Sequence, residues 1–227
     1  MADESGLTRR TVIGAGAAAV ASVAVSDLLN VSSLLANTGP TNGVGYFARF
    51  GVTEQLIRST LSSALSKGGD YADVFFQHRV SNNLSLEDGI VNRASANVAL
   101  GVGVRVLKGD QTGYGFTEDI TPDGLRRAAL TAAAIAQGPA REGPARFKVM
   151  EAKPNRYPVK VRWEDIRPQQ KLTVLNGLNE KTFKADPRVK KVSLGFTDQG
   201  SVMLVADSTG RIVEDAQPMT TMYLSVV

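Results

Sequence analysis

The stretch that decides the fold is Gly69–Ala136, which reads GDYADVFFQHRVSNNLSLEDGIVNRASANVALGVGVRVLKGDQTGYGFTEDITPDGLRRAALTAAAIA. Within it, Tyr71–Val80 is rich in aromatic and β-branched residues, which is typical of a β-strand. Two short strands, Asn83–Glu87 and Ile90–Ala94, meet at Asp88-Gly89, a dipeptide that supplies the positive φ angles of a type I′ hairpin turn. We therefore assign Asp88 and Gly89 a structural role in this turn.

The second half of the stretch predicts another hairpin and a helix. Residues 98–106 alternate valine or leucine with mostly small residues, and this period of two gives the strand one strongly apolar face. After a turn at Lys108–Asp110, residues 111–117 form a further strand. Thr121-Pro122 then provides the N-cap and first residue of a helix that stops before Gly138. The pattern predicts an antiparallel meander with a helix on one face.

The rest of the chain predicts a second unit of the same kind. A helix begins near Thr53, and a proline-rich, basic connector fills 139–158, which we interpret as a solvated linker with a phosphate-binding patch as the alternative. Val159–Trp163 is a candidate strand, and a second helical pattern runs from Ile166 to Asp186. Four short strands follow, at 189–197, 201–206, 211–216 and 219–227, and we expect turns between them at Asp198–Gly200, Asp207–Gly210 and Gln217-Pro218.

The predicted fold class is therefore α+β, with antiparallel meander sheets and helices packed on one face. We expect two successive α/β units, at 53–138 and 159–227. The last strand ends without a turn or polar tail, and we expect a chain truncated at this point.

Several short sequences in the deciding stretch resemble one family. They are Asp70–Asp73 (DYAD), Glu87–Gly89 (EDG), Gly101–Val106 (GVGVRV) and Gly113–Thr117 (GYGFT). As a set they resemble the TldD/PmbA proteins, metal-dependent peptidases once called modulators of DNA gyrase, and more closely the TldD branch. The resemblance covers roughly residues 50–227. It implies the amino-terminal region, which in the family walls the substrate cleft and contributes to pairing between subunits.

The resemblance also implies a metal site that this sequence does not contain. The family motif HExxxH holds a metal with two histidines, whereas this chain has a single histidine, His78, and no cysteine. Hydrolysis by a bound metal needs about three protein ligands around an open position. We therefore assign no catalytic or metal-binding residue, interpret His78 as a partly buried strand residue, and expect a zinc-type metal only in a full-length relative.

A peptide cleft is the site that the resemblance leaves for this chain. A sheet edge can bind an extended peptide through backbone hydrogen bonds, glycines allow close approach, and an arginine can hold a carboxylate. In the alternative, the glycines relieve crowding under a helix and the arginine pairs with Asp73 or Glu87. The candidate residues are Gly101, Gly103, Arg105, Gly113, Tyr114 and Gly115.

Three functions remain open. The first is the substrate-cleft and assembly region of a TldD-like peptidase that is inactive alone, with a peptide and a TldD/PmbA-type subunit as partners. The second is a non-catalytic partner subunit or regulatory domain that pairs with a complete relative. The third is a nucleic-acid or gyrase-associated factor. A net charge of +4 without a concentrated basic face argues against nucleic acid as a partner.

The amino terminus resembles an export signal. Arg9-Arg10 precedes a short apolar run, 12–25, which is too short for an ordinary membrane span and fits a twin-arginine signal. We expect a signal at 1–36, a linker at 37–52, and a protein exported to the periplasm or another compartment outside the cytoplasm. In the alternative, the segment is an alanine-rich helix and the protein is cytoplasmic.

Overall fold

The computed structural model describes residues 44–151, 161 and 163–227. The predicted export signal, with Arg9 and Arg10, lies outside these residues, as does most of the candidate strand at Val159–Trp163. The helical elements are η1 (Gly45–Phe50), α2 (Glu54–Ala64), α3 (Pro122–Ala133), η2 (Trp163–Asp165) and α4 (Pro168–Ala185). The strands are β1 (Tyr71–Glu87), β2 (Ile90–Lys108), β3 (Gln111–Thr117), β4 (Lys148–Glu151), β5 (Val192–Asp207) and β6 (Arg211–Val226).

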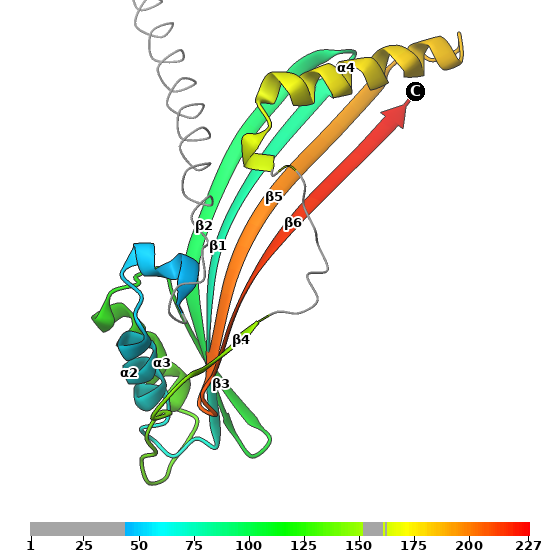
Figure 1. The fold of residues 1–227 in the computed structure, drawn as a ribbon. Helices are drawn as coiled ribbons and strands as arrows, with labels where there is room; N and C mark the ends of the chain where they lie inside the picture. The colour runs from blue at the N-terminus through cyan, green and yellow to red at the C-terminus, as the bar shows by residue number, and fades with distance from the viewer. Residues whose placement is uncertain (1–43, 152–160, 162) are drawn as a thin grey trace, which may run out of the picture.

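All the described strands join one sheet in the order β3-β2-β1-β5-β6-β4 (Figure 1). Neighbouring strands are antiparallel except β4 and β6, which are parallel. The α+β class with mostly antiparallel strands is thus confirmed. The two predicted units share this sheet, because β1 pairs along its length with both β2 and β5.

The strands are longer than the sequence predicted. The separate strands on either side of Ser81 form one strand, β1, and β2 likewise runs unbroken. The predicted turn at Asp198–Gly200 is wrong, because these residues lie inside β5. Gln217-Pro218 likewise does not end a strand. Pro218 fits inside β6 because β4 pairs only with residues 211–214, so its nitrogen needs no partner in a neighbouring strand.

The tight turns agree with the prediction. Asp88 and Gly89 have φ angles of 50° and 80°, as a type I′ turn requires. The Asp88 carboxylate also accepts a hydrogen bond from the backbone N–H of Val192 at 2.8 Å, so the hairpin is fastened to the start of β5. The predicted N-cap of α3 is also present. The Thr121 hydroxyl accepts a hydrogen bond from the Gly124 N–H at 3.2 Å, and the helix begins at the next residue, Pro122.

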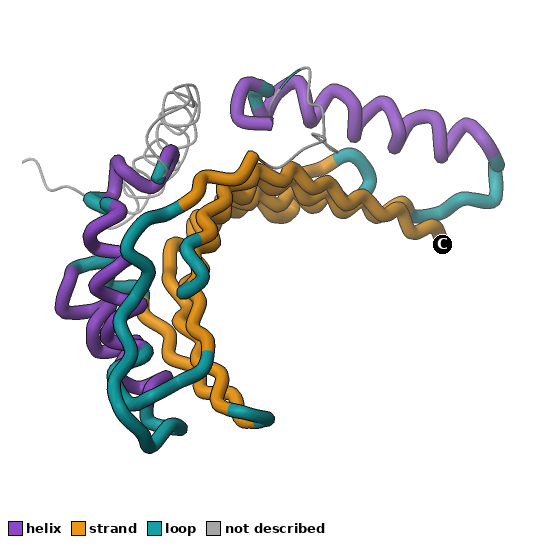
Figure 2. Tube along the Cα trace, turned by 60° about the horizontal axis from the view of Figure 1, so that its bottom comes forward, coloured by secondary structure: helices purple, strands orange, loops and turns teal. Residues whose placement is uncertain are grey.

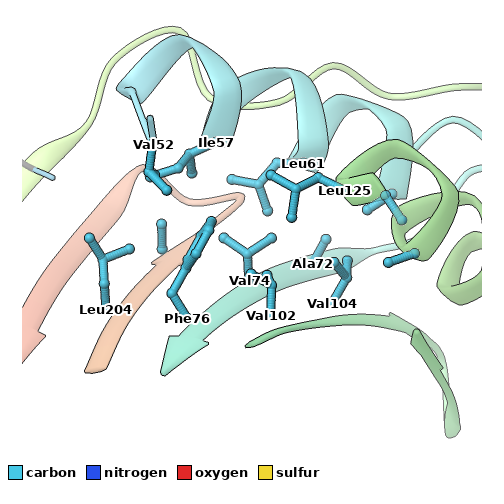
Figure 3. Close-up of a cluster of buried hydrophobic side chains, with 14 of the residues drawn as sticks. Val52, Ile57, Leu61, Ala72, Val74, Phe76, Val102, Val104, Leu125 and Leu204 are labelled. Carbon is cyan, nitrogen blue, oxygen red and sulfur yellow. The ribbon is translucent and has the colours of Figure 1, made fainter. Parts of the chain in front are cut away.

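The main core lies between one face of the sheet and α2, α3 and η1. Figure 3 shows side chains from α2, such as Ile57 and Leu61, pointing toward Val74 and Phe76 on β1. Tyr46 and Phe47, which the sequence placed in a linker, are buried in this core. The reason is a docking contact that no local pattern reveals: the Tyr46 N–H donates to the Glu214 carboxylate on β6 at 2.8 Å.

A second, smaller core lies under α4 at the far end of the sheet. It consists of Leu86, Leu175, Val192, Leu194 and Phe196. Both cores use the same sheet face, since the inward residues of β1 and β5 keep even numbers throughout. The sheet is strongly bent, and the described helices lie on its convex side (Figure 2). No described helix lies on the concave side.

The expected connector at 139–158 contains an element that the sequence did not predict. Lys148–Glu151 forms β4, which pairs with the first residues of β6. The Lys148 N–H donates to the Gly210 carbonyl at 2.6 Å and sets the register of this pair.

Candidate functional site

The concave face carries an apolar row that crosses the whole sheet. Cross-strand partners lie on the same face of a sheet, so the registers of the six strands define the row residue by residue. It consists of Phe116, Gly103, Phe75, Val205, Val213 and Met150, in the order β3 to β4. Phe116 and Met150 at its ends are 60% and 45% exposed, so the row is open to a ligand.

A charged row lies two residues along the strands from the apolar row, at a distance of about 7 Å. Tyr114 pairs with Arg105, which pairs with Asp73, which in turn pairs with Asp207. Arg211 follows the tight turn and binds the same Asp207. Arg105 with Asp73 and Arg211 with Asp207 are the arginine–aspartate ion pairs that the described residues form on the concave face.

Each aspartate in this row is buried and holds an arginine. Asp73 accepts from Arg105 Nη2 at 2.6 Å and from Nε at 2.9 Å, and Asp207 accepts from Arg211 Nε at 2.7 Å. Burial acts to raise the pKa of Asp207, but hydrogen bonds from Thr209 and Arg211 outweigh it and leave this pKa lowered. Asp207 therefore holds Arg211 as an ion pair near neutral pH.

Tyr71 lies between the two pairs. Its hydroxyl donates to Asp207 Oδ2 at 3.3 Å. Burial, together with the charges of Asp207 and Asp73, raises the pKa of the Tyr71 phenol. The phenol therefore keeps its proton near neutral pH and acts as a donor in the row.

The six predicted cleft residues divide between the two faces. Gly113 and Gly115 lie under α3, where a Cβ atom would collide with the carbonyl oxygens of Ala132 and Ala128. Because these two residues have no side chain, α3 can pack closely on β3. This agrees with the alternative in which the glycines relieve crowding under a helix.

Gly101, Gly103, Arg105 and Tyr114 lie on the concave face. The rings of Phe116 and Tyr114 cover Gly101 and Gly103, respectively, so these glycines seat aromatic side chains. Arg105 pairs with Asp73, one of the two partners considered for it. Their role in binding a peptide stays a prediction.

Sequence reasoning missed Asp207, Arg211 and Phe75 as members of this face. Asp207 belongs to a turn pattern, and its place opposite Asp73 depends on the pairing of β1 with β5. The available signal was the alternation of Phe75 with buried Val74 and Phe76, which places Phe75 on the opposite face of its strand.

His78 is buried and bound to another side chain of the main core. It is 8% exposed, lies on β1 as expected, and its Nδ1 is 2.6 Å from the Tyr46 hydroxyl. Burial, with a smaller contribution from Arg49, lowers the pKa of His78. The described residues contain no group of three His, Cys, Asp or Glu side chains placed to hold a metal. The described residues therefore do not fit the metal that the resemblance implies.

Two segments of the chain match described protein domains. Residues 72–136 match PmbA/TldA metallopeptidase domain 1, and residues 162–227 match the PmbA/TldA metallopeptidase central domain. The α+β fold and these two matches correspond to the first and central domains described for PmbA/TldA metallopeptidases. The chain belongs to the TldD/PmbA family.

Curated relatives agree with this assignment. The Metalloprotease TldD homolog of Haemophilus influenzae is 29% identical over 162 residues, covering 70% of this chain and 33% of the relative. That of Buchnera aphidicola subsp. Acyrthosiphon pisum is 25% identical over 182 residues, covering 78% of this chain and 36% of the relative. The chain thus spans about a third of the length of these relatives.

Solved structures show the same fold. A protein described as a putative modulator of DNA gyrase from Bacteroides thetaiotaomicron has a TM-score of 0.57 at 16% identity, over 76% of this chain and 40% of that one. TldE from Thermococcus kodakarensis has a TM-score of 0.52 at 21% identity, over 77% of this chain and 38% of that one. Among the described helices, none has both the length and the apolar character of a membrane span.

Proposed function

We propose that this chain forms the substrate-cleft and assembly region of a TldD-like metal-dependent peptidase. The observation that carries the proposal is the apolar row across the concave face, bordered by Arg105. An extended peptide alternates its side chains with a period of two, so an apolar side chain on the side that faces the sheet can rest on this row. The peptide is the expected substrate, and the role extends to unfolded segments of proteins.

The metal chemistry of such a peptidase requires ligands from outside this sequence. The chain has one histidine, and that side chain is committed to Tyr46 in the core. A zinc-type metal would therefore be bound by the part of a full-length family member that this chain does not cover. We expect the chain alone to hydrolyse no peptide.

The second candidate is a non-catalytic subunit that pairs with a complete relative. Residues 215–226 of β6 pair with β5 on one side, and within the described part of the chain no strand pairs with the other side. Met222, Leu224 and Val226 on this strand are 42–52% exposed. Unpaired strand edges with apolar side chains are common sites of association, so this edge favours assembly with a TldD/PmbA-type subunit.

A binding experiment tests the cleft. Fluorescence anisotropy of a labelled, unstructured octapeptide with alternating apolar residues should show saturable binding to the 227-residue chain. Phe75→Ala combined with Phe116→Ala removes two rings of the row and should weaken this binding at least tenfold. The control Ile90→Ala alters a side chain that is 72% exposed at the far hairpin and should have no effect. Unsaturable binding, or equal binding by both variants, would exclude the concave face as the cleft.

A mixing experiment tests the second candidate. The chain should co-elute with a complete TldD/PmbA-type protein in size-exclusion chromatography if it acts as a partner subunit. If it supplies only a cleft within a longer protein, the two proteins should elute separately.

Export by the twin-arginine route is a further part of the proposal. It rests on the sequence around Arg9 and Arg10. Fusion of residues 1–40 to a reporter that works only outside the cytoplasm should give a signal. If that signal survives Arg9→Lys combined with Arg10→Lys, the twin-arginine assignment is wrong.

A further inference from the structure

Two arginines of the charged row bind neighbouring aspartates, and the same tyrosine contributes to the pKa of both arginines. The pKa of Arg105 is raised by its hydrogen bond to Asp73 and also, to a smaller extent, by Tyr71. The pKa of Arg211 is raised by its hydrogen bond to Asp207 and likewise by Tyr71. The geometry links the two arginines through their partners. Arg105 on β2 binds Asp73, Arg211 at the start of β6 binds Asp207, and the two aspartates are cross-strand neighbours on β1 and β5. The Tyr71 hydroxyl donates to Asp207 in the same row.

Burial of the charges in this row is unequal. The side chains of Asp73 and Asp207 are 11% and 5% exposed, whereas those of Arg105 and Arg211 are 49% and 58% exposed. The ion pairs balance in total charge, but solvent meets mainly the positive members. A ligand on the concave face would thus contact guanidinium groups before it contacted a carboxylate.

The arginines also keep hydrogen-bond donors for a ligand. A guanidinium has five N–H donors. Asp73 accepts through one oxygen from Nε and Nη2 of Arg105, and Asp207 accepts from Nε of Arg211. These bonds fix both side chains in place and use only part of the donor set of each partly exposed arginine. Fixed guanidinium groups bind carboxylates well, because little side-chain entropy is lost on binding.

The spacing of the two rows suits a carboxylate on a side chain that lies two residues from an apolar side chain of the same peptide. In an extended peptide, residues i and i+2 point to the same side and are about 7 Å apart. The charged and apolar rows are also separated by two residues on the same face, as the positions of Asp73 and Phe75 show. An apolar side chain on one row therefore places the side chain two residues away over the other.

We infer that Arg105 and Arg211 form a subsite for an acidic side chain, and that the chain prefers peptides with the pattern apolar-x-Glu or apolar-x-Asp. This inference rests on the proposed function, since it assumes that a peptide lies on the concave face. It adds a preference in sequence to the cleft.

The test compares three labelled peptides of one length that differ at a single feature. The first contains Leu-x-Glu with an amidated C-terminus, the second Leu-x-Gln with an amidated C-terminus, and the third Leu-x-Gln with a free C-terminal carboxylate. Anisotropy titrations with the 227-residue chain should show that the Glu peptide binds about tenfold more tightly than either Gln peptide. This difference should shrink as the salt concentration rises, because the arginines are partly exposed.

Variants assign the preference to the two arginines. Arg105→Gln combined with Arg211→Gln should bind the Glu peptide only as tightly as the Gln peptide. Arg79→Gln is the matched control. Arg79 lies on β1, is exposed on the concave face, and has no ion-pair partner among the described residues. It should keep the full preference. Because the double variant leaves two buried aspartates unpaired, Arg211→Lys provides a milder change that retains the charge, and it should lose part of the preference.

The outcomes separate this inference from the proposed function. Equal binding of all three peptides to the unaltered chain would overturn the acidic subsite and leave the cleft intact. Tighter binding of the free C-terminal peptide than of the Glu peptide would also overturn it, in favour of terminal carboxylate recognition. Absence of binding by every peptide would overturn the proposed function itself. Retained binding of the Gln peptide by the double variant shows that this variant is folded.

Discussion

Lys171 on α4 and Asp198 on β5 form an ion pair of 2.7 Å in which the side chains are 6% and 2% exposed. Asn82 on β1 donates to the second oxygen of the same carboxylate at 2.8 Å. The Lys171 ammonium also lies 5.4 Å from the centroid of the Trp163 ring. This network joins α4 and η2 to the two central strands of the sheet.

Removal of the lysine should therefore destabilise the protein strongly. Lys171→Met leaves the Asp198 charge buried without its partner, and we expect a loss of about 3 kcal/mol in the free energy of unfolding. Urea denaturation provides the measurement. The control is Lys184→Met, which breaks an exposed pair with Glu180 and should cost less than about 0.5 kcal/mol. Equal effects of the two substitutions would show that the buried pair contributes nothing special.

Acidification should destabilise the protein through His78. Burial lowers the pKa of His78 in the folded state, so the unfolded chain takes up the proton first as the pH falls. The stability that neutral His78 contributes is therefore complete above the unfolded pKa of about 6.5 and is lost progressively below it. Urea denaturation between pH 5 and 8 should show that the free energy of unfolding of the unaltered protein exceeds that of His78→Gln by an amount that decreases as the pH falls.

A nearby carboxyl group opposes this trend and must be separated from it. Burial raises the pKa of Glu214, against smaller lowering contributions from the Tyr46 N–H and Arg49. Its folded form therefore gains stability on protonation, as the pH falls through the raised value. In Glu214→Gln, the free energy of unfolding should fall more steeply with decreasing pH than in the unaltered protein. An unchanged pH dependence would contradict the raised pKa of Glu214.

Two glycines should respond to alanine in opposite directions. Gly115→Ala places a methyl group against the Ala128 carbonyl and should destabilise the protein by about 1–3 kcal/mol, because α3 must move away from β3. Gly177→Ala lies within α4 with open space around it and should stabilise by about 0.5–1 kcal/mol. Thermal unfolding of both variants measures the effects. A neutral Gly115→Ala would mean that the helix adjusts freely.

Local signals in the sequence predicted the local parts of the fold. Asp88-Gly89 and Thr121-Pro122 specify their turn and helix start from neighbouring residues alone, and the structure confirms both. Asp198 was misread as a turn residue because its carboxylate is neutralised by Lys171, which lies 27 residues away in the sequence. Residue type alone does not show such a partner.

The candidate site was predictable in part for the same reason. Arg105 drew attention because it interrupts a run of glycine and valine within one strand. Tyr71 and Asp207 are 136 residues apart and meet only when β1 pairs with β5. The two rows are therefore properties of the strand register, which the sequence patterns left open.

The pairing of β1 on both sides also bears on how this protein reaches its native state. A ribosome synthesises β1 more than a hundred residues before β5, as the separation of Tyr71 from Asp207 shows. During that interval one complete edge of β1 has no native neighbour, and such edges invite intermolecular pairing. Contacts between distant residues also slow folding. That edge of β1 is therefore open to mispairing in the nascent chain until translation reaches β5.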